Sequence, residues 1–263
     1  MVDLGLLGKI GARTAERIAR EKTRRPVEML RTQPLYDHPP MSLTKALSGS
    51  GPKVIAEVKF ASPSEGVLKS DASPVHAAKI ASSYAAAGAA AISILTDPEF
   101  FGGDFSFLAG ARDSCPTTPL LMKDFMVDEY QFELARSIGA DAVLLIAALL
   151  GPRLPDMYGA AKSLGLSVLI EVHNEAEAEA ALTAGDAVIG VNSRDLKTLK
   201  VDLNVARRLA PMIVKTRVAV AESGIRSRAD MDSLFVAGYK GFLIGTAFMK
   251  APEPGSALLN FLS

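Results

Sequence analysis

Short apolar runs recur along the chain from residue 53 to residue 246, with more polar stretches between them. The runs are continuously apolar and do not alternate with polar residues, which is typical of parallel β-strands buried on both faces. The sequence has eight of them, at residues 53–59, 90–96, 119–125, 141–147, 167–172, 187–192, 217–223 and 241–246. The pattern therefore predicts eight buried strands.

The stretches between these runs are amphipathic, as in "SPVHAAKIASSYAAAG" and "DEYQFELARSIG". Several end in a glycine directly before the next run, at Gly88, Gly139, Gly185 and Gly238. Glycine is preferred just past the C-terminus of a helix, so each stretch is predicted to be a helix that returns to the next strand. Eight strand–helix units within residues 47–263 favour an α/β fold of the (β/α)8 TIM-barrel class, with an open doubly wound sheet as the alternative.

Residues 1–46 precede this repeat and carry nine basic and five acidic residues. We expect a mostly solvated helix from Asp3 to about Arg20, followed by a basic linker that ends at Pro39 and Pro40. Ser42 can cap a short helix, "LTKAL". The segment is interpreted as an N-terminal helical extension packed on the barrel, within one domain overall, in preference to a nucleic-acid-binding arm.

Composition argues against a nucleic-acid-binding, membrane or secreted protein. Lys+Arg and Asp+Glu are equal at 29 each, so no net field directs the chain to nucleic acid or to a membrane. The longest apolar run, residues 142–150, is far shorter than a membrane span, and the N-terminus lacks the pattern of a signal peptide. The single Cys115 cannot form an internal disulfide, which fits a reducing compartment. We expect a cytoplasmic protein.

Metal and cofactor motifs are not found in the sequence. His38, His76 and His173 stand at unrelated positions, so a His/Cys metal site is not expected. The sequence contains no phosphate loop, and Gly5, Gly8 and Gly11 do not follow a strand as a dinucleotide fingerprint would. The residues alone therefore give no indication of a His/Cys metal site or of a dinucleotide-binding site.

Polar residues are concentrated at the C-terminal ends of the predicted strands: Glu57, Lys59, Lys123, Glu171, Asn192, Glu222 and Ser223. In a TIM barrel all strands run the same way, so these side chains converge on the rim where active sites lie. A lone buried charge costs several kcal/mol or shifts its pKa, whereas lysines and glutamates together offset each other and suit acid–base chemistry. The alternative is an ion-pair network that only fills the barrel mouth.

Two further motifs favour a phosphate site. "ESGI" at 222–225 and "IGTAF" at 244–248 each place a glycine beside a hydroxyl residue after a strand. The backbone N–H groups of Gly224, Gly245 and Thr246 can bind a phosphate there. The loop "FASPSEG" supplies Ser62 as a further hydroxyl and has the composition of a mobile lid. Tight turns and an ordinary surface loop, without any ligand, are the alternatives.

The chain contains, in this order, the stretches "IAEVKFASPSEG", "ILTDPEFFGG", "LLMKDFMVDEYQ", "GADAVLLI", "IEVHNEAEAEAAL", "IGVNSRDLKTLKVDL", "VAESGI" and "FLIGTAFM". In these stretches it resembles a known family, the indole-3-glycerol phosphate synthases, and the resemblance covers essentially its whole length. It implies a barrel that converts 1-(2-carboxyphenylamino)-1-deoxyribulose 5-phosphate to indole-3-glycerol phosphate, carbon dioxide and water in tryptophan biosynthesis. It also implies a lyase without cofactor that acts as a monomer and is able to dock to other enzymes of that pathway.

The resemblance assigns catalytic roles residue by residue. Lys123 is similar to the general acid that protonates the substrate carbonyl, and Lys59 to a cation near the substrate carboxylate that is also a candidate second proton donor. Glu171 resembles the acid–base partner of the dehydration, and Glu57 the carboxylate that holds the lysines charged and oriented. Asn192 resembles a group that positions the substrate. The division of labour between the two lysines stays open.

The resemblance also implies binding roles. Arg194 is similar to a substrate-positioning residue, Glu222 to a carboxylate that binds a hydroxyl, and Phe101 and Phe125 to apolar walls for the aryl ring. The phosphate-binding set is Ser62, Ser223, Gly224, Gly245 and Thr246. The chain departs from the family pattern in two places, with Phe60 where a basic residue is usual and Thr246 in place of the commoner serine.

Two other classes of protein share part of this pattern. A sugar-phosphate isomerase or a Schiff-base aldolase would also be a phosphate-binding barrel, and the aldolase would use a strand-end lysine. A non-catalytic barrel for a phosphorylated ligand would keep "ESGI" and "IGTAF". That barrel would have no use for Glu57, Lys59, Lys123 and Glu171 together.

Overall fold

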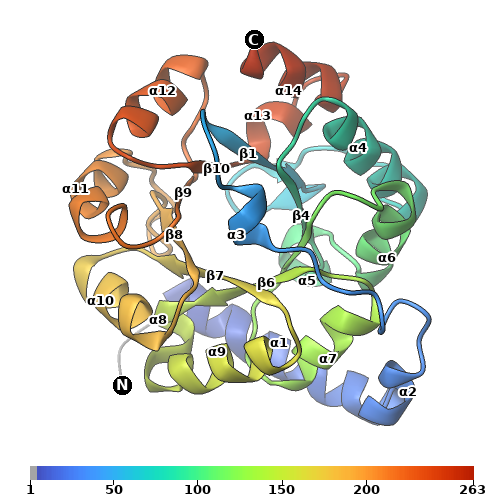
Figure 1. Ribbon diagram of the computed structural model, residues 1–263. Helices are drawn as coiled ribbons and strands as arrows, with labels where there is room; N and C mark the ends of the chain where they lie inside the picture. The colour runs from blue at the N-terminus through green and yellow to red at the C-terminus, as the bar shows by residue number, and fades with distance from the viewer. Residues whose placement is uncertain (1–4) are drawn as a thin grey trace.

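The computed structural model describes residues 5–263 (Figure 1). Eight parallel strands close into a barrel in which β1 pairs with both β4 and β10, so the alternative of an open sheet is wrong. The strands are β1 (Lys53–Val58), β4 (Ala91–Leu95), β5 (Leu120–Lys123), β6 (Ala142–Ile146), β7 (Ser167–Val172), β8 (Val188–Asn192), β9 (Ala219–Glu222) and β10 (Gly241–Ile244). Each lies within the apolar run that predicted it, which confirms the TIM-barrel fold.

Helices surround the barrel as a ring (Figure 1). The longer ones are α4 (Pro74–Ala86), α6 (Phe105–Ser114), α7 (Tyr130–Ser137), α9 (Leu154–Ser163), α10 (Glu175–Ala184), α11 (Asn204–Ile213), α12 (Arg228–Val236) and α14 (Pro254–Leu262). Shorter ones are α5 (Pro98–Phe101), α8 (Ala147–Leu150), the 3-10 turn Gly151–Arg153 and α13 (Thr246–Met249). Ser73, Asn174 and Ser227 cap α4, α10 and α12 with their side chains, as helix N-termini require.

The strands are buried on both faces, as their apolar character predicts. Alternate residues of β1 belong to different clusters: Val54, Ala56 and Val58 pack with the surrounding helices, whereas Ile55 packs inside the barrel. The inner cluster also takes one or more residues from each of the other strands. Because side chains alternate across a strand, Glu57 shares the inner side with Ile55 and reaches the barrel mouth.

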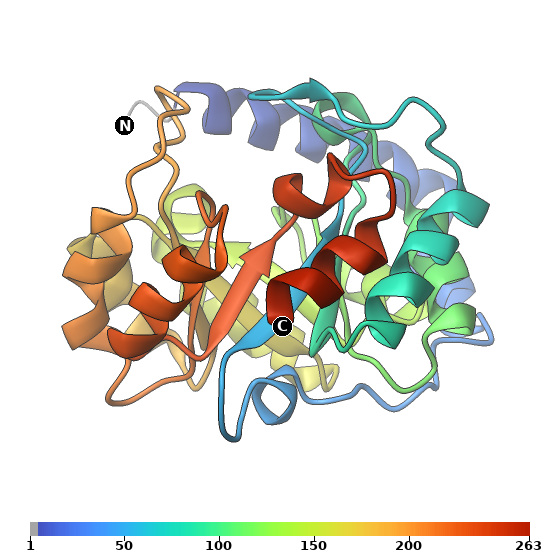
Figure 2. The ribbon, with the colours of Figure 1, turned by 90° about the horizontal axis from the view of Figure 1, so that it is seen from above.

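Two helices of the N-terminal segment cover opposite ends of the barrel (Figure 2). Helix α3 (Leu43–Ala46) lies at the N-terminal end of the strands, where Leu43 and Leu47 are fully buried in the inner cluster. The Ser42 side chain accepts a hydrogen bond from the Lys45 N–H, which confirms the predicted cap. Helix α1 (Gly5–Arg24) lies across the other end, toward which the strands point.

The sequence-based view of the extension was wrong in two respects, and its Asp3 lies outside the described residues. Helix α1 is not mostly solvated, because Leu7, Ile10 and Ile18 are buried along one face, while most of its charged residues lie on the other. The expected basic linker contains a further helix, α2 (Val27–Arg31). A buried ion pair anchors α1, with Arg17 Nη2 at 2.6 Å from Asp124 Oδ1.

The loop "FASPSEG" forms a short antiparallel hairpin of β2 (Ala61–Ser62) and β3 (Gly66–Val67). It follows β1 and stands at the end of the barrel that α1 covers (Figure 2). Among the helices of residues 5–263, none has both the length and the apolar character needed to cross a membrane.

Candidate active site

A pocket of about 650 Å³ opens at the C-terminal ends of the strands. This volume is in the range of small-molecule sites. Every residue that the sequence predicted for the site lines it: Glu57, Lys59, Ser62, Phe101, Lys123, Phe125, Glu171, Asn192, Arg194, Glu222, Ser223, Gly224, Gly245 and Thr246. Barrel closure therefore brings together residues that are up to 189 positions apart in the sequence, from Glu57 to Thr246.

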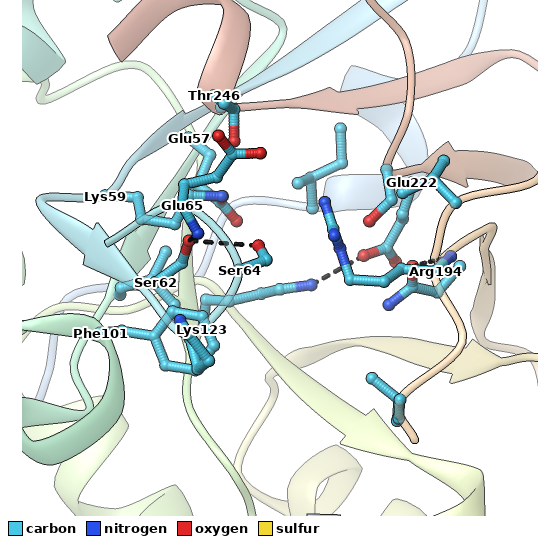
Figure 3. Close-up of a pocket in the computed structure, with 18 of the residues that line it drawn as sticks. Glu57, Lys59, Ser62, Ser64, Glu65, Phe101, Lys123, Arg194, Glu222 and Thr246 are labelled. Carbon is cyan, nitrogen blue, oxygen red and sulfur yellow. Dashed lines mark hydrogen bonds and ion pairs between the residues drawn. The ribbon is translucent and has the colours of Figure 1, made fainter. Parts of the chain in front are cut away.

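Lys123 stands at the centre of the charged residues (Figure 3). Its Nζ lies 2.7 Å from Glu222 Oε2 and 3.2 Å from Glu171 Oε2, so one ammonium bridges the ends of β9 and β7. All three side chains are largely buried, with exposed fractions of 13% for Lys123, 4% for Glu171 and 2% for Glu222. One cation thus serves two buried carboxylates.

This arrangement separates the protonation states of the three groups. Burial alone would lower the pKa of Lys123, but Glu222, Glu171 and Glu57 outweigh it and raise that pKa above its ordinary value. Burial opposes ionisation of Glu171, yet Lys123 and His173 hold its pKa well below the usual range. Burial raises the pKa of Glu222 to about 7, against the attraction of Lys123 and with repulsion from Glu171 and Glu57. Near neutral pH, Lys123 is charged and a proton is available at Glu222.

A second ion pair lies beside the first. Lys59 Nζ is 2.8 Å from Glu57 Oε1, and both side chains are mostly buried. Strand β1 and the residue directly after it thus supply both members of this pair, while Lys123 takes its partners from β7 and β9.

Two glycines make room for these carboxylates. A Cβ at Gly190 would lie 2.1 Å from Glu222 Oε1, and a Cβ at Gly245 would lie 2.5 Å from Glu57 Oε1. Real Cβ atoms do not approach so closely, so any larger residue would displace the charged groups. Gly190 was not identified from the sequence, although a glycine inside a strand is a signal of close approach.

The end of the pocket for which the sequence predicts a phosphate site lies at β9 and β10. Ser223 has φ of +64° and Gly224 has φ of +81°, so the chain turns sharply after β9. Positive φ is uncommon for residues other than glycine, and such strain is concentrated at functional sites. Lys250 also lines this part of the pocket, where its Nζ lies 2.7 Å from Glu65 Oε2 of the hairpin.

The other end is apolar. Phe101 and Phe125 lie with ring centroids 5.9 Å apart. Leu6, Leu7 and Ile10 of α1 line the pocket too, and the sequence analysis missed them. Their spacing on one face of a helix was a usable signal, but only the position of α1 over the barrel mouth reveals that this face lines the pocket.

Polar neighbours complete the site. Asn192 Oδ1 accepts a hydrogen bond from the Arg194 N–H at 3.0 Å, and the Arg194 side chain donates to the Leu199 carbonyl at 2.8 Å. His173 Nε2 lies 3.4 Å from Glu171 Oε1. The sequence analysis treated His173 as an isolated histidine. It follows Glu171 by two residues, however, and residues two apart in an extended chain point to the same side.

Residues 5–263 contain no group of three or more His, Cys, Asp or Glu side chains arranged to hold a metal ion. The charged groups of the pocket are instead arranged as lysine–carboxylate pairs. Such pairs can give and take protons, and the Lys123 ammonium can stabilise an oxygen that becomes negative.

Residues 7–261 match the family model described as indole-3-glycerol phosphate synthase. The chain belongs to the indole-3-glycerol phosphate synthase family. A relative of that name from Acidithiobacillus ferrooxidans is 43% identical over 258 residues, which is 96% of this chain and 97% of the relative. Another from Burkholderia vietnamiensis is 50% identical over 208 residues, covering 79% of this chain and 78% of the relative.

Solved structures support the fold independently. The chain is similar to 3-hexulose-6-phosphate synthase from Salmonella typhimurium, with a TM-score of 0.62 at 13% identity over 80% of this chain and 98% of that one. It is also similar to a tryptophan synthase α-subunit mutant from Pyrococcus furiosus, with a TM-score of 0.61 at 12% identity over 80% and 96% of the two chains. At these identities the likeness concerns the barrel fold alone.

One departure from the indole-3-glycerol phosphate synthase pattern has a structural explanation. Phe60 is 3% exposed and packs against the Phe107 ring, with centroids 5.4 Å apart, in the cluster between strands and helices. It does not line the pocket, because it points to the opposite side from Lys59. Here Phe60 anchors the stem of the hairpin by burial.

Proposed function

We propose that this chain catalyses the ring closure, decarboxylation and dehydration that convert 1-(2-carboxyphenylamino)-1-deoxyribulose 5-phosphate to indole-3-glycerol phosphate, carbon dioxide and water in tryptophan biosynthesis. The observation that carries the proposal is Lys123, buried between Glu171 and Glu222 in the one pocket that also holds the phosphate-type turns. Membership of the indole-3-glycerol phosphate synthase family supports the same substrate.

The two ends of the pocket suit the two ends of this substrate. Its phosphate binds at the turns after β9 and β10, where the proposed ligands are Ser62, Ser223, Gly224, Gly245 and Thr246. Its aryl ring lies against the apolar wall that Phe101 and Phe125 form together, and Lys59 faces the aryl carboxylate.

Ring closure is the first step. The ring carbon that bears the carboxylate attacks the ketone carbon, and the carbonyl oxygen gains negative charge as its π bond breaks. Lys123 donates a proton to this oxygen, which becomes a hydroxyl. A charge that is already in place and desolvated stabilises the transition state more than the ground state, so Lys123 contributes where it accelerates the reaction most.

Decarboxylation follows. The bond to the carboxylate breaks, carbon dioxide leaves, and its electron pair returns to the ring system, where it neutralises the iminium formed on closure. Loss of carbon dioxide is faster for a carboxylate that is poorly solvated. The aromatic walls, with Lys59 as a single cation held by Glu57, provide such surroundings.

Dehydration restores the aromatic indole. Glu171 takes a proton from the ring, and the new hydroxyl leaves as water after it receives a proton from Lys59. Glu222 binds a hydroxyl of the sugar chain, and Asn192 and Arg194 hold the intermediate in position. The low pKa of Glu171 keeps it ionised at neutral pH, which is the protonation state that a base requires.

The test is direct. Purified protein supplied with the ribulose phosphate substrate, without added metal, should generate indole fluorescence. Lys123→Ala should lower kcat by about 10²- to 10⁴-fold because it removes the general acid. Lys162→Ala, on the exposed side of α9, is the matched control and should keep parental turnover. Turnover of Lys123→Ala near that of the parent would exclude Lys123 as the acid.

The rival functions give different results. A Schiff-base aldolase would leave a borohydride-trapped adduct on Lys123 or Lys59, and we expect none. A non-catalytic barrel would bind the substrate without forming indole. We further propose a cytoplasmic monomer, because one chain supplies the whole set of pocket residues, and light scattering during size-exclusion chromatography would detect a dimer.

A further inference from the structure

Lys123 does not by itself explain which of its two carboxylates is ionised. Its Nζ is nearer to Glu222, at 2.7 Å, than to Glu171, at 3.2 Å. Because a shorter contact favours the charged form more strongly, this cation alone would make Glu222 the ionised partner. Two buried carboxylates that share one cation separate into an acid and a base when their surroundings differ, so a further group must favour the charge on Glu171.

His173 is a group that distinguishes them. It follows β7, and its Nε2 lies 3.4 Å from Glu171 Oε1, the oxygen that Lys123 does not contact. Its Nδ1 lies 3.1 Å from Glu177 Oε2 at the start of α10. Glu171 therefore stands between two cations, one at each oxygen.

The His173 ring is held in place by the N-terminus of α10. The backbone N–H of His173 donates to Glu177 Oε2 at 2.8 Å, and the side-chain amide of Asn174 donates to Glu177 Oε1 at 2.6 Å. Asn174 in turn caps the helix by accepting from the Glu177 N–H at 3.0 Å. Glu177 thus has both oxygens bound locally and keeps its charge facing the imidazole.

The surroundings keep His173 protonated. Burial lowers its pKa, but the carboxylates of Glu171 and Glu177 outweigh burial and raise it to about 10. Asp195, in the loop after β8, is a further acidic residue that interacts with the charge of His173. Acidic groups from β7, from α10 and from this loop therefore act on His173, while the nearby cation Lys123 contacts the other oxygen of Glu171.

Glu222 has no comparable support. The cation that faces it is Lys123, and the other charged groups that act on it, Glu171 and Glu57, are both negative. Its Oε1 has no hydrogen-bond partner within residues 5–263. This oxygen lies in the space left by the missing side chain of Gly190. Protonation of this oxygen therefore breaks no existing contact.

We propose that His173, held by Glu177, is a positioning residue that assigns the negative charge of the shared pair to Glu171 and leaves the proton on Glu222. Its importance for turnover rests on the function proposed above, in which Glu171 is the base of the dehydration. Glu222 then meets the substrate as a neutral carboxyl that can donate a hydrogen bond to a hydroxyl as well as accept one.

A titration of the substrate-free protein tests the charge assignment without using activity. In protein labelled at the glutamate carboxyl carbons, NMR should detect one carboxyl with a midpoint near pH 7, and Glu222→Gln should remove that signal. His173→Gln keeps an amide donor of similar reach but carries no charge. In that variant the Glu171 midpoint should rise by about one to two pH units, because this carboxylate loses one of its two cations, and the Glu222 midpoint should move by less, so the gap between the two midpoints narrows.

Glu177→Gln is the second variant, since it keeps an acceptor for the His173 N–H while removing the charge that supports the imidazolium. It should move both midpoints in the same directions by a smaller amount. His76→Gln is the matched control, because His76 pairs with Asp71 at 2.8 Å and does not line the pocket. Unchanged midpoints in folded His173→Gln, or a Glu222→Gln protein that keeps the signal near pH 7, would overturn the proposal.

Kinetics then test the consequence for catalysis. The acidic limb of the kcat–pH profile, where Glu171 gains its proton, should move up by about one to two pH units in His173→Gln, with KM within twofold of the parent, because Glu171 becomes easier to protonate. A uniform loss of kcat at every pH would contradict the charge assignment. A protein that shows the expected titrations but forms no indole would refute the proposed function and leave the role of His173 intact.

Discussion

The missing side chain of Gly190 makes room for the Glu222 carboxylate inside the barrel, so a single methyl group there tests the geometry of the site. In Gly190→Ala the new Cβ would lie 2.1 Å from Glu222 Oε1. Ordinary contact begins at 3.4 Å, so the carboxylate must retreat by about 1.3 Å. If the 2.7 Å contact between Lys123 and Glu222 lengthened by the same amount, the ion pair would be broken.

The expected result is a loss of turnover with little loss of fold. Misplacing a catalytic group by about 1 Å costs on the order of 10²-fold in rate, or about 2.7 kcal/mol of transition-state stabilisation. We therefore expect kcat of Gly190→Ala to fall by about two orders of magnitude in the indole fluorescence assay. KM should change less, because the phosphate turns and the aromatic walls are not displaced.

A chemically identical change elsewhere in the chain serves as the control. Gly159 lies in α9, and a Cβ there would meet nothing within 4 Å. Gly159→Ala should keep full activity and gain about 0.5–1 kcal/mol of stability, because alanine loses less backbone entropy in a helix. Adding Glu222→Asp to Gly190→Ala shortens the carboxylate side chain, so the double variant should lose less activity than the sum of its single changes. A Gly190→Ala protein with kcat within twofold of the parent would refute the reasoning.

Three further outcomes are expected. Glu65→Gln frees Lys250 from its 2.7 Å ion pair at the phosphate end, so inorganic phosphate should inhibit about twofold to fivefold more strongly, and weaker inhibition would contradict this. Arg17→Met leaves the buried Asp124 carboxylate without its cation, and chemical denaturation should reveal a loss of about 3 kcal/mol; a loss below about 1 kcal/mol would mean that the pair does not anchor α1. The pKa of Glu222 is raised from 4.5 to about 7 in the folded state, so the folded protein binds this proton more tightly than the unfolded chain does. Loss of the proton therefore makes the folded state less stable as pH rises through that window. The free energy of unfolding of Glu222→Gln should therefore decline less between pH 5 and pH 7 than that of the parent.

The sequence pattern was sufficient for the barrel, because its signals are local and repeated. Each strand is a continuous apolar run, and glycine marks the returns at Gly88 and Gly238, where φ is +90° and +106°. The N-terminal segment was misjudged because its signals are weak and do not repeat. The apolar face of α1 is narrow among many charges, and a helix such as Val27–Arg31 is too short for periodicity to reveal.

The residues of the site were also predictable, since polar groups that end apolar strands conflict with local burial and so indicate function. The resemblance to the indole-3-glycerol phosphate synthases supplied their expected roles. The part of the site that comes from helices was not found, because Leu6, Leu7 and Ile10 look like ordinary core residues until α1 is seen across the barrel mouth.

The sequence by itself determined that lysines and carboxylates gather at one rim, because strand order and direction place every strand end there. Only the tertiary structure decided the pairing, in which Lys59 takes Glu57 while Lys123 takes Glu222 and Glu171. Pair partners depend on strand register and on spaces such as the one at Gly190, which are fixed when the barrel closes. Since a pKa depends on distances of a few ångströms, the protonation order at this rim is a property of the closed barrel and not of the residue types alone.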